Sequence, residues 1–184
     1  MTERGGPPMA ELVGPPVCEP ASPADLEAIA AQLGRPTRGT RCVAHRCPCG
    51  RPDVVQTSPR LPDGAPFPTL YYLTCPRATV AVSTLESAGV MRQMNARLAD
   101  DPELAARYAA AHEAYLARRE AIELVPELAG ISAGGMPTRV KCLHVHLGQA
   151  LASGPGVNPF GDETRDLIGP WWSAGPCVAA GGHD

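Results

Sequence analysis

The chain has 184 residues, the size of one ordinary domain, which is enough to bury a hydrophobic core without disulfide support. Its net charge of -3 and its lack of any Lys/Arg run argue against nucleic acid or an anionic membrane surface as a partner. No stretch approaches the roughly 20 apolar residues of a membrane span, and MTERGGPPMAELVGPP lacks the pattern of a signal peptide, so we expect a cytoplasmic protein.

Seven cysteines require an explanation. Because the cytoplasm is reducing and seven is an odd number, we do not expect a disulfide framework. Metal ligation, catalysis or simple burial remain as roles for these residues, and their spacing has to distinguish among them.

The N-terminal part of the chain divides into a leader and a first helix. Residues 1–21 are rich in proline with little apolar patterning, and we predict a disordered leader in which Cys18 has no assigned role. Ser22 and Pro23 are typical of a helix start, and Gly34 is typical of a helix end.

From Arg41 the pattern changes to short extended segments separated by Pro and Gly turns. These segments are RCVAHRC, DVVQTS and TLYYLTC. They predict a small antiparallel sheet over about residues 40–75.

After Cys75 the helical period returns. We predict helices over 76–88, over about 90–98, from Asp101 and Pro102 onward, over 138–151, and from near Asp162. The whole pattern predicts an α+β fold with the sheet packed against four or five helices. Residues 22–172 form the single globular domain, and residues 173–184 form a flexible tail.

Possible chemistry is concentrated in three short stretches, HRCPCG, YYLTCP and KCLHVH. Residues four apart on a helix share a face, so the last stretch favours Cys142 and His146 as a pair, with His144 as second choice. Cys75 precedes Pro76 and should sit at a helix N-terminus, where a thiolate is favoured. The candidate metal ligands are Cys47, Cys49, Cys75, Cys142, His144 and His146.

A zinc site can be assembled from Cys47, Cys75, Cys142 and His146, with Cys49 as a replacement. An iron–sulfur cluster is the other cofactor that these soft ligands accept. We therefore expect a cytoplasmic metal-binding protein whose single centre joins three distant segments of the chain.

Other interpretations stay open. The cysteines can be inert core residues, or Cys75 can be a nucleophile with His144 or His146 as its base. The protein can also be an enzyme that uses an open metal position or a cluster. An interaction module without chemistry, bound to a protein partner, is a further alternative.

Two sequence blocks, PFPTLYYLTCP and KCLHVH…NPFGDE, carry a resemblance. The chain resembles a bacterial, mainly actinobacterial, family catalogued as a domain of unknown function, over about residues 25–170. The motif residues that match are Cys47, Cys75, Cys142, His144 and His146, whereas Cys42 and Cys49 are less typical of that family. Its members are often encoded near septum-formation initiator-like, enolase and exopolyphosphatase genes, which implies a housekeeping cytoplasmic role but no mechanism. The interaction module considered above would then serve division or envelope proteins.

Overall fold

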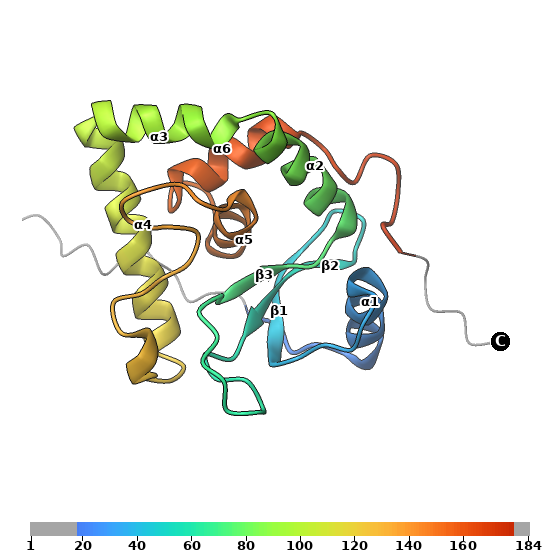
Figure 1. Ribbon diagram of the computed structural model, residues 1–184. Coiled ribbons are helices and arrows are strands. Elements are labelled where there is room, and N and C mark those ends of the chain that lie inside the picture. The colour runs from blue at the N-terminus through green and yellow to red at the C-terminus, as the bar shows by residue number, and fades with distance from the viewer. Residues whose placement is uncertain (1–17, 179–184) are drawn as a thin grey trace, which may run out of the picture.

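The computed structural model describes residues 18–178, in which six α-helices surround one three-stranded antiparallel sheet (Figure 1). The predicted α+β class and the early sheet are confirmed. The described residues form six helices, where four or five were expected. The elements are α1 (Pro23–Leu33), β1 (Thr40–Arg46), β2 (Pro52–Thr57), β3 (Tyr71–Leu73), α2 (Pro76–Ser87), α3 (Val90–Asp100), α4 (Pro102–Glu120), the 3-10 turn η2 (Pro126–Leu128), α5 (Leu143–Ser153) and α6 (Pro159–Ile168).

Three of the six helix starts, those of α1, α4 and α6, follow from local side-chain capping. The side chain of Ser22 accepts a hydrogen bond from the Asp25 N–H and completes a capping box, and Asp101 caps α4 in a similar way. Helix α6 begins before the expected Asp162. The Asn158 side chain accepts hydrogen bonds from two backbone N–H groups of the first turn, and Pro159 occupies the first helical position. The Asn-Pro pair was the signal for this earlier start.

Helix α5 begins at Leu143, later than the expected Thr138. The amide group of Asn95 takes the backbone of Val140 out of any helix: its Oδ1 accepts from the Val140 N–H at 2.8 Å, and its Nδ2 donates to the Val140 carbonyl at 2.9 Å. The N–H of Lys141 donates to the Gly134 carbonyl instead of an intrahelical one. Residues before Leu143 therefore form a loop fastened to α3.

The central strand β2 is buried along its whole length. It pairs with β1 on one side and β3 on the other, and α1 and α5 contact it from the two faces of the sheet (Figure 1). This position explains why PDVVQT has no polar alternation, since neither face of β2 meets water.

Helix α5 lies between the sheet and α6 at distances that only glycine allows. A Cβ on Gly148 would lie 3.0 Å from the carbonyl oxygen of Tyr71 on β3. A Cβ on Gly161 of α6 would overlap the carbonyl oxygen of His146 and lie 2.7 Å from the Cβ of Ala150. The two glycines thus set the spacing of the layers around α5.

Substitution Gly161→Ala should destabilise the protein by about 2 kcal/mol or more, because backbone atoms of α5 and α6 must separate to admit the methyl group. Chemical denaturation measures the loss. Asp166→Ala is the matched control, since Asp166 lies on the same helix with its side chain 71% exposed, and it should cost less than about 0.5 kcal/mol. Equal effects of the two substitutions would contradict the close α5–α6 contact.

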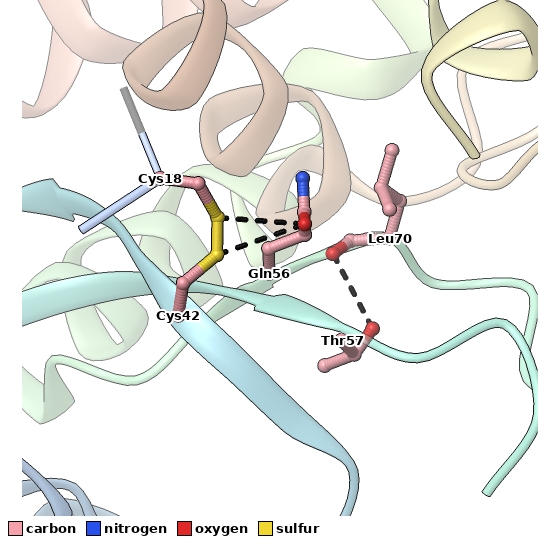
Figure 2. Close-up of a disulfide and its surroundings, with 5 residues drawn as sticks. All are labelled: Cys18, Cys42, Gln56, Thr57 and Leu70. Carbon is pink, nitrogen blue, oxygen red and sulfur yellow. Dashed lines mark hydrogen bonds between the residues drawn. A yellow bond between two sulfur atoms is a disulfide. The ribbon is translucent and has the colours of Figure 1, made fainter. Parts of the chain in front are cut away.

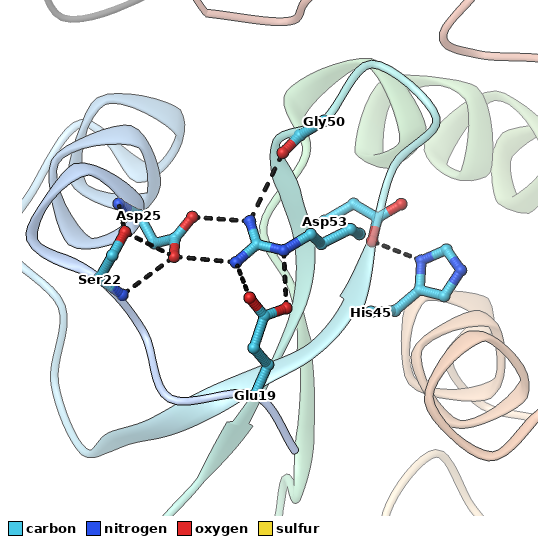
Figure 3. A network of polar contacts seen from close by, with 7 residues as sticks. Glu19, Ser22, Asp25, His45, Gly50 and Asp53 are labelled. Carbon is cyan, nitrogen blue, oxygen red and sulfur yellow. Dashed lines mark hydrogen bonds and ion pairs between the residues drawn. The ribbon is translucent and has the colours of Figure 1, made fainter. Parts of the chain in front are cut away.

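An ion-pair cluster fastens α1 to the sheet (Figure 3). The guanidinium of Arg46 on β1 binds the Asp25 carboxylate through two bonds of 2.7 and 2.9 Å, and binds Glu19 as well. Hydrogen bonding to Arg46 is the main reason that the pKa values of Asp25 and Glu19 lie below their ordinary values. The same Asp25 carboxylate completes the α1 capping box, so one residue both starts the helix and docks it.

Substitution Asp25→Asn should lower the free energy of unfolding at pH 7 by about 1 to 2 kcal/mol, since it removes a charge-assisted pair with a partly exposed arginine. Because the folded pKa of Asp25 is depressed, its contribution is complete above the unfolded pKa of about 4 and falls as the pH drops further. Unfolding titrations of both proteins between pH 7 and pH 2 should therefore converge at the acid end. A constant difference across this range would show that Arg46 does not stabilise the ionised form.

The segment before α1 reaches the sheet and carries one disulfide, whereas the other five cysteines are free, so the cysteines do not form a disulfide framework. Glu19 forms an antiparallel bridge with Val43, and this contact places Cys18 beside Cys42 of β1, with Cα atoms 5.4 Å apart (Figure 2). The Gln56 Oε1 atom lies next to both sulfur atoms. Residues 1–17 of the predicted leader lie outside the described residues.

Candidate metal centre between α2 and α5

Cys142 is the residue immediately before α5 and has an extended backbone, with φ -152° and ψ 109°. The helical rule that pairs residues four apart therefore does not apply to Cys142 and His146. The nearby imidazole is that of His144, whose Nδ1 lies 3.8 Å from the Cys142 Sγ. His144, the second choice from the sequence, is therefore the histidine that lies beside Cys142.

Glu86, near the end of α2, joins this pair. Its Oε1 accepts a hydrogen bond from the Leu143 N–H at 2.7 Å and lies 3.2 Å from the His144 Nδ1. Since Cys142 makes no side-chain cap, Glu86 supplies the cap for α5 from another helix. Sequence reasoning missed Glu86, because nothing in the local pattern of α2 shows which distant helix end it faces.

Among residues 18–178, the ligand atoms of Glu86, Cys142 and His144 form the one group of three or more His, Cys, Asp or Glu side chains within 4.8 Å of one another. We call this group the α2–α5 site. All three residues are half-buried. The site therefore combines a sulfur, a nitrogen and an oxygen donor at a position that solvent can still reach.

The orientation of the His144 ring is set by backbone. Its Nε2 lies 3.2 Å from the carbonyl oxygen of Thr79, which can only accept a hydrogen bond, so Nε2 carries a proton. In the neutral ring, the Nδ1 lone pair then points toward the Cys142 sulfur and the Glu86 carboxylate. Three electron-rich atoms can converge in this way only if a cation, either a proton or a metal ion, lies among them.

The pKa values of Cys142 and His144 shift in opposite directions. Burial opposes ionisation of the Cys142 thiol, but hydrogen bonds from His144 and from the Val145 N–H outweigh it, so the pKa of Cys142 lies below its ordinary value. The hydrogen bond to Cys142 raises the pKa of His144, against the opposing effect of burial and with help from Glu86. Each group thus makes the charged form of the other more favourable.

A cavity of about 370 Å³ opens beside the α2–α5 site. Cys142 and His144 contribute to its wall, and the rest of the wall is apolar or hydroxylic, with no charged side chain. These other lining residues are Thr69, Tyr71, Tyr72, Leu73, Thr79 and Val145. A small molecule in the cavity could reach the sulfur of Cys142.

Cys75 occupies the residue before α2, as the sequence predicts, but its side chain makes no cap and its thiol is not activated. Burial raises the pKa of Cys75 to about 11, because it outweighs the hydrogen bonds from the Ala78 and Arg77 N–H groups. Glu86 lies about 16 Å further along the α2 axis, at a rise of about 1.5 Å per residue. Cys75 therefore lies far from Glu86 and is not part of the α2–α5 site.

Cys47 and Cys49 lie in the turn between β1 and β2 and contact each other. Burial, with the negative charge of Asp53 nearby, raises the pKa of Cys47 to about 12. Neither residue is part of the α2–α5 site. The structure thus divides the predicted ligands among distinct places, and the α2–α5 site contains only Cys142 and His144 of them.

His146 is fully buried and hydrogen-bonded at both ring nitrogens. Its Nδ1 accepts from the Asn158 Nδ2 at 3.2 Å, and its Nε2 lies 3.0 Å from the Tyr108 hydroxyl and 3.1 Å from the Gly134 carbonyl. Burial lowers the pKa of His146 to about 4, so the ring is neutral. In this arrangement it ties α4, α5 and α6 together and has no nitrogen free for a metal.

The comparisons with known proteins agree with the resemblance seen in the sequence. Residues 43–166 match the profile of a family described as protein of unknown function (DUF501). The chain belongs to this family. No curated protein and no solved structure matches it. The matched range contains every residue of the α2–α5 site, and no helix in the described part of this DUF501 protein is long and apolar enough to cross a membrane.

Proposed function

We propose that this DUF501 protein binds one divalent metal ion at the α2–α5 site, through Glu86, Cys142 and His144. The observation that carries the proposal is the contact of the His144 Nε2 with the Thr79 carbonyl, which turns the other ring nitrogen toward the sulfur and the carboxylate. A metal-bound histidine usually donates a hydrogen bond from its other ring nitrogen, and a backbone carbonyl is one of the usual acceptors.

The donor set favours zinc over an iron–sulfur cluster. Zinc accepts nitrogen, sulfur and oxygen ligands in one site, whereas a cluster requires three or four cysteines, and the α2–α5 site has one. The Glu86 carboxylate has enough lone pairs to keep its bond to the Leu143 N–H while it binds a metal.

Three protein ligands beside a cavity are typical of a catalytic zinc site. Zinc in such a site polarises a bound water or carbonyl group. Within the chain, Thr79 orients His144, Glu86 neutralises charge, and the apolar and hydroxylic wall of the cavity would contact a bound substrate. We therefore place a zinc-dependent enzyme ahead of a purely structural zinc protein.

Elemental analysis of the full chain, purified without chelators or added metal, should find one zinc per molecule. The substitutions Cys142→Ser, His144→Gln and Glu86→Gln should each weaken zinc binding by about 10-fold to 100-fold or more in a competition titration with a chromophoric chelator. Glu86→Gln keeps an acceptor for the Leu143 N–H, so its loss of zinc would not come from an uncapped helix. Cys49→Ser is the control and should retain full stoichiometry.

The ligand set predicted from the sequence, which includes Cys47 and Cys75 but not Glu86, leads to a different expected result in the same experiment. If Cys47→Ser and Cys75→Ser abolish zinc binding while Glu86→Gln does not, the metal lies elsewhere and the α2–α5 site is not its location. Protein that contains no metal after purification and takes up none from a zinc buffer would overturn the proposal altogether.

A second candidate function is covalent catalysis by Cys142, which the lowered pKa of this thiol and the raised pKa of His144 favour. In that case the cation between the three atoms is a proton on His144. The cavity would then hold a substrate whose electrophilic carbon the sulfur attacks. Glu86 would stabilise the protonated ring.

Alkylation by iodoacetamide distinguishes the two candidates. If Cys142 is a free thiolate, it should react before the other free cysteines and remain reactive below the ordinary thiol pKa of about 8.5, and His144→Gln should slow it about 10-fold or more. If zinc is bound, Cys142 should be protected until a chelator is added. Peptide mass spectrometry after brief labelling identifies the modified residue.

A further inference from the structure

The segment after α6 is fastened across the start of α2 (Figure 1). The Arg77 guanidinium donates to the Gly175 carbonyl at 2.5 Å, and the Gln32 Nε2 lies 3.2 Å from the Cys177 sulfur. The same Gln32 nitrogen donates to the Pro52 carbonyl at 2.7 Å, so one amide connects α1, β2 and the C-terminal segment. Cys177 therefore has a defined place against the domain.

That place is beside the thiol of Cys75. The Cys177 side chain lies close enough to Cys75 to affect the pKa of its thiol, and both side chains pack against the main hydrophobic core. Cys75 is 1% exposed, whereas Cys177 is only half-buried. One thiol of the pair can meet a dissolved oxidant, and the other is held next to it and sheltered from solvent.

A metal does not explain this pair. Within the described residues, Cys75 and Cys177 belong to no group of three or more His, Cys, Asp or Glu ligand atoms that all lie within 4.8 Å of one another. The α2–α5 site does not use the pair either, since its ligand group contains neither Cys75 nor Cys177. Two adjacent thiols without a further ligand can still form a disulfide.

We propose that Cys75 and Cys177 form an oxidisable dithiol, a modification site for hydroperoxides. The Cys177 thiolate attacks the distal oxygen of the peroxide, the O–O bond breaks, and the products are the sulfenic acid of Cys177 and an alcohol or water. The Cys75 thiol then attacks that sulfur and displaces water, so that two thiols and one hydroperoxide give one disulfide, one water and one alcohol or water. The sulfurs lose two electrons and the peroxide gains them.

The disulfide would fix the C-terminal segment to the start of α2. In the reduced protein this segment is held by hydrogen bonds such as those of Arg77 and Gln32. The covalent link would add a restraint close to Trp171 and Trp172, whose rings pack 4.6 Å apart between α6 and Cys177. Their fluorescence can report the change.

The test treats the full chain with one equivalent of hydrogen peroxide, blocks remaining thiols with N-ethylmaleimide, and maps tryptic peptides by mass spectrometry without reduction. Trypsin separates the residues cleanly, because peptide 61–77 holds only Cys75 and peptide 166–184 holds only Cys177. We expect a cross-linked pair of these peptides, with a mass two hydrogens below their sum, as the main new disulfide. A slower proteolytic release of the C-terminal segment should accompany it.

The matched variants are Cys177→Ser, Cys49→Ser and Cys142→Ser. Cys177→Ser should abolish the cross-link and leave Cys75 open to the maleimide after denaturation, whereas the other two should form the cross-link as wild type does. Because Cys142→Ser removes a ligand of the α2–α5 site, its cross-link separates this inference from the proposed metal binding. Oxidation that yields only sulfinic acid at Cys177, or a disulfide to another cysteine, would overturn the proposal.

Discussion

The position of α5 is the constraint on which the rest of the structure depends. The helix is enclosed by the sheet and α6 at distances that Gly148 and Gly161 permit, and a buried polar side chain then fixes its rotation. His146 meets Tyr108 of α4 and Asn158 at the start of α6, and each hydrogen bond is shielded from water. A buried network that is satisfied in this way allows one arrangement of three helices, since any rotation of α5 leaves polar groups unpaired.

Fixing α5 also fixes its N-terminus, and the candidate metal centre follows from that. Helix α5 needs an acceptor for its first N–H groups, and Glu86 provides one from α2. The same carboxylate then faces His144 and Cys142, so helix capping and the gathering of ligands are two results of one contact. This double role explains why the α2–α5 site is half-buried: the carboxylate must reach the helix end, and the end must stay near the surface.

The cysteines divide according to their surroundings. Cys18 is joined to Cys42, Cys47 contacts Cys49, and Cys75 contacts Cys177, which leaves Cys142 as the cysteine with a histidine and a glutamate beside it. Burial raises the pKa of Cys47 and Cys75, whereas hydrogen bonds lower that of Cys142. The sulfur environment, more than the cysteine spacing, separates a candidate ligand from a packed or paired thiol.

The sequence by itself determined the fold class, the early sheet and most helix starts, because capping residues, prolines and apolar periods act over a few neighbouring positions. It also indicated KCLHVH as a place of chemistry, and from this stretch Cys142 and His144 lie together in the α2–α5 site. The choice of His144 over His146 was decided by tertiary structure, since Asn95 holds Val140 in a loop and leaves Cys142 outside α5. Glu86 and the partners of Cys18 and Cys177 were likewise decided only by packing, which joins segments whose contacts no local pattern encodes.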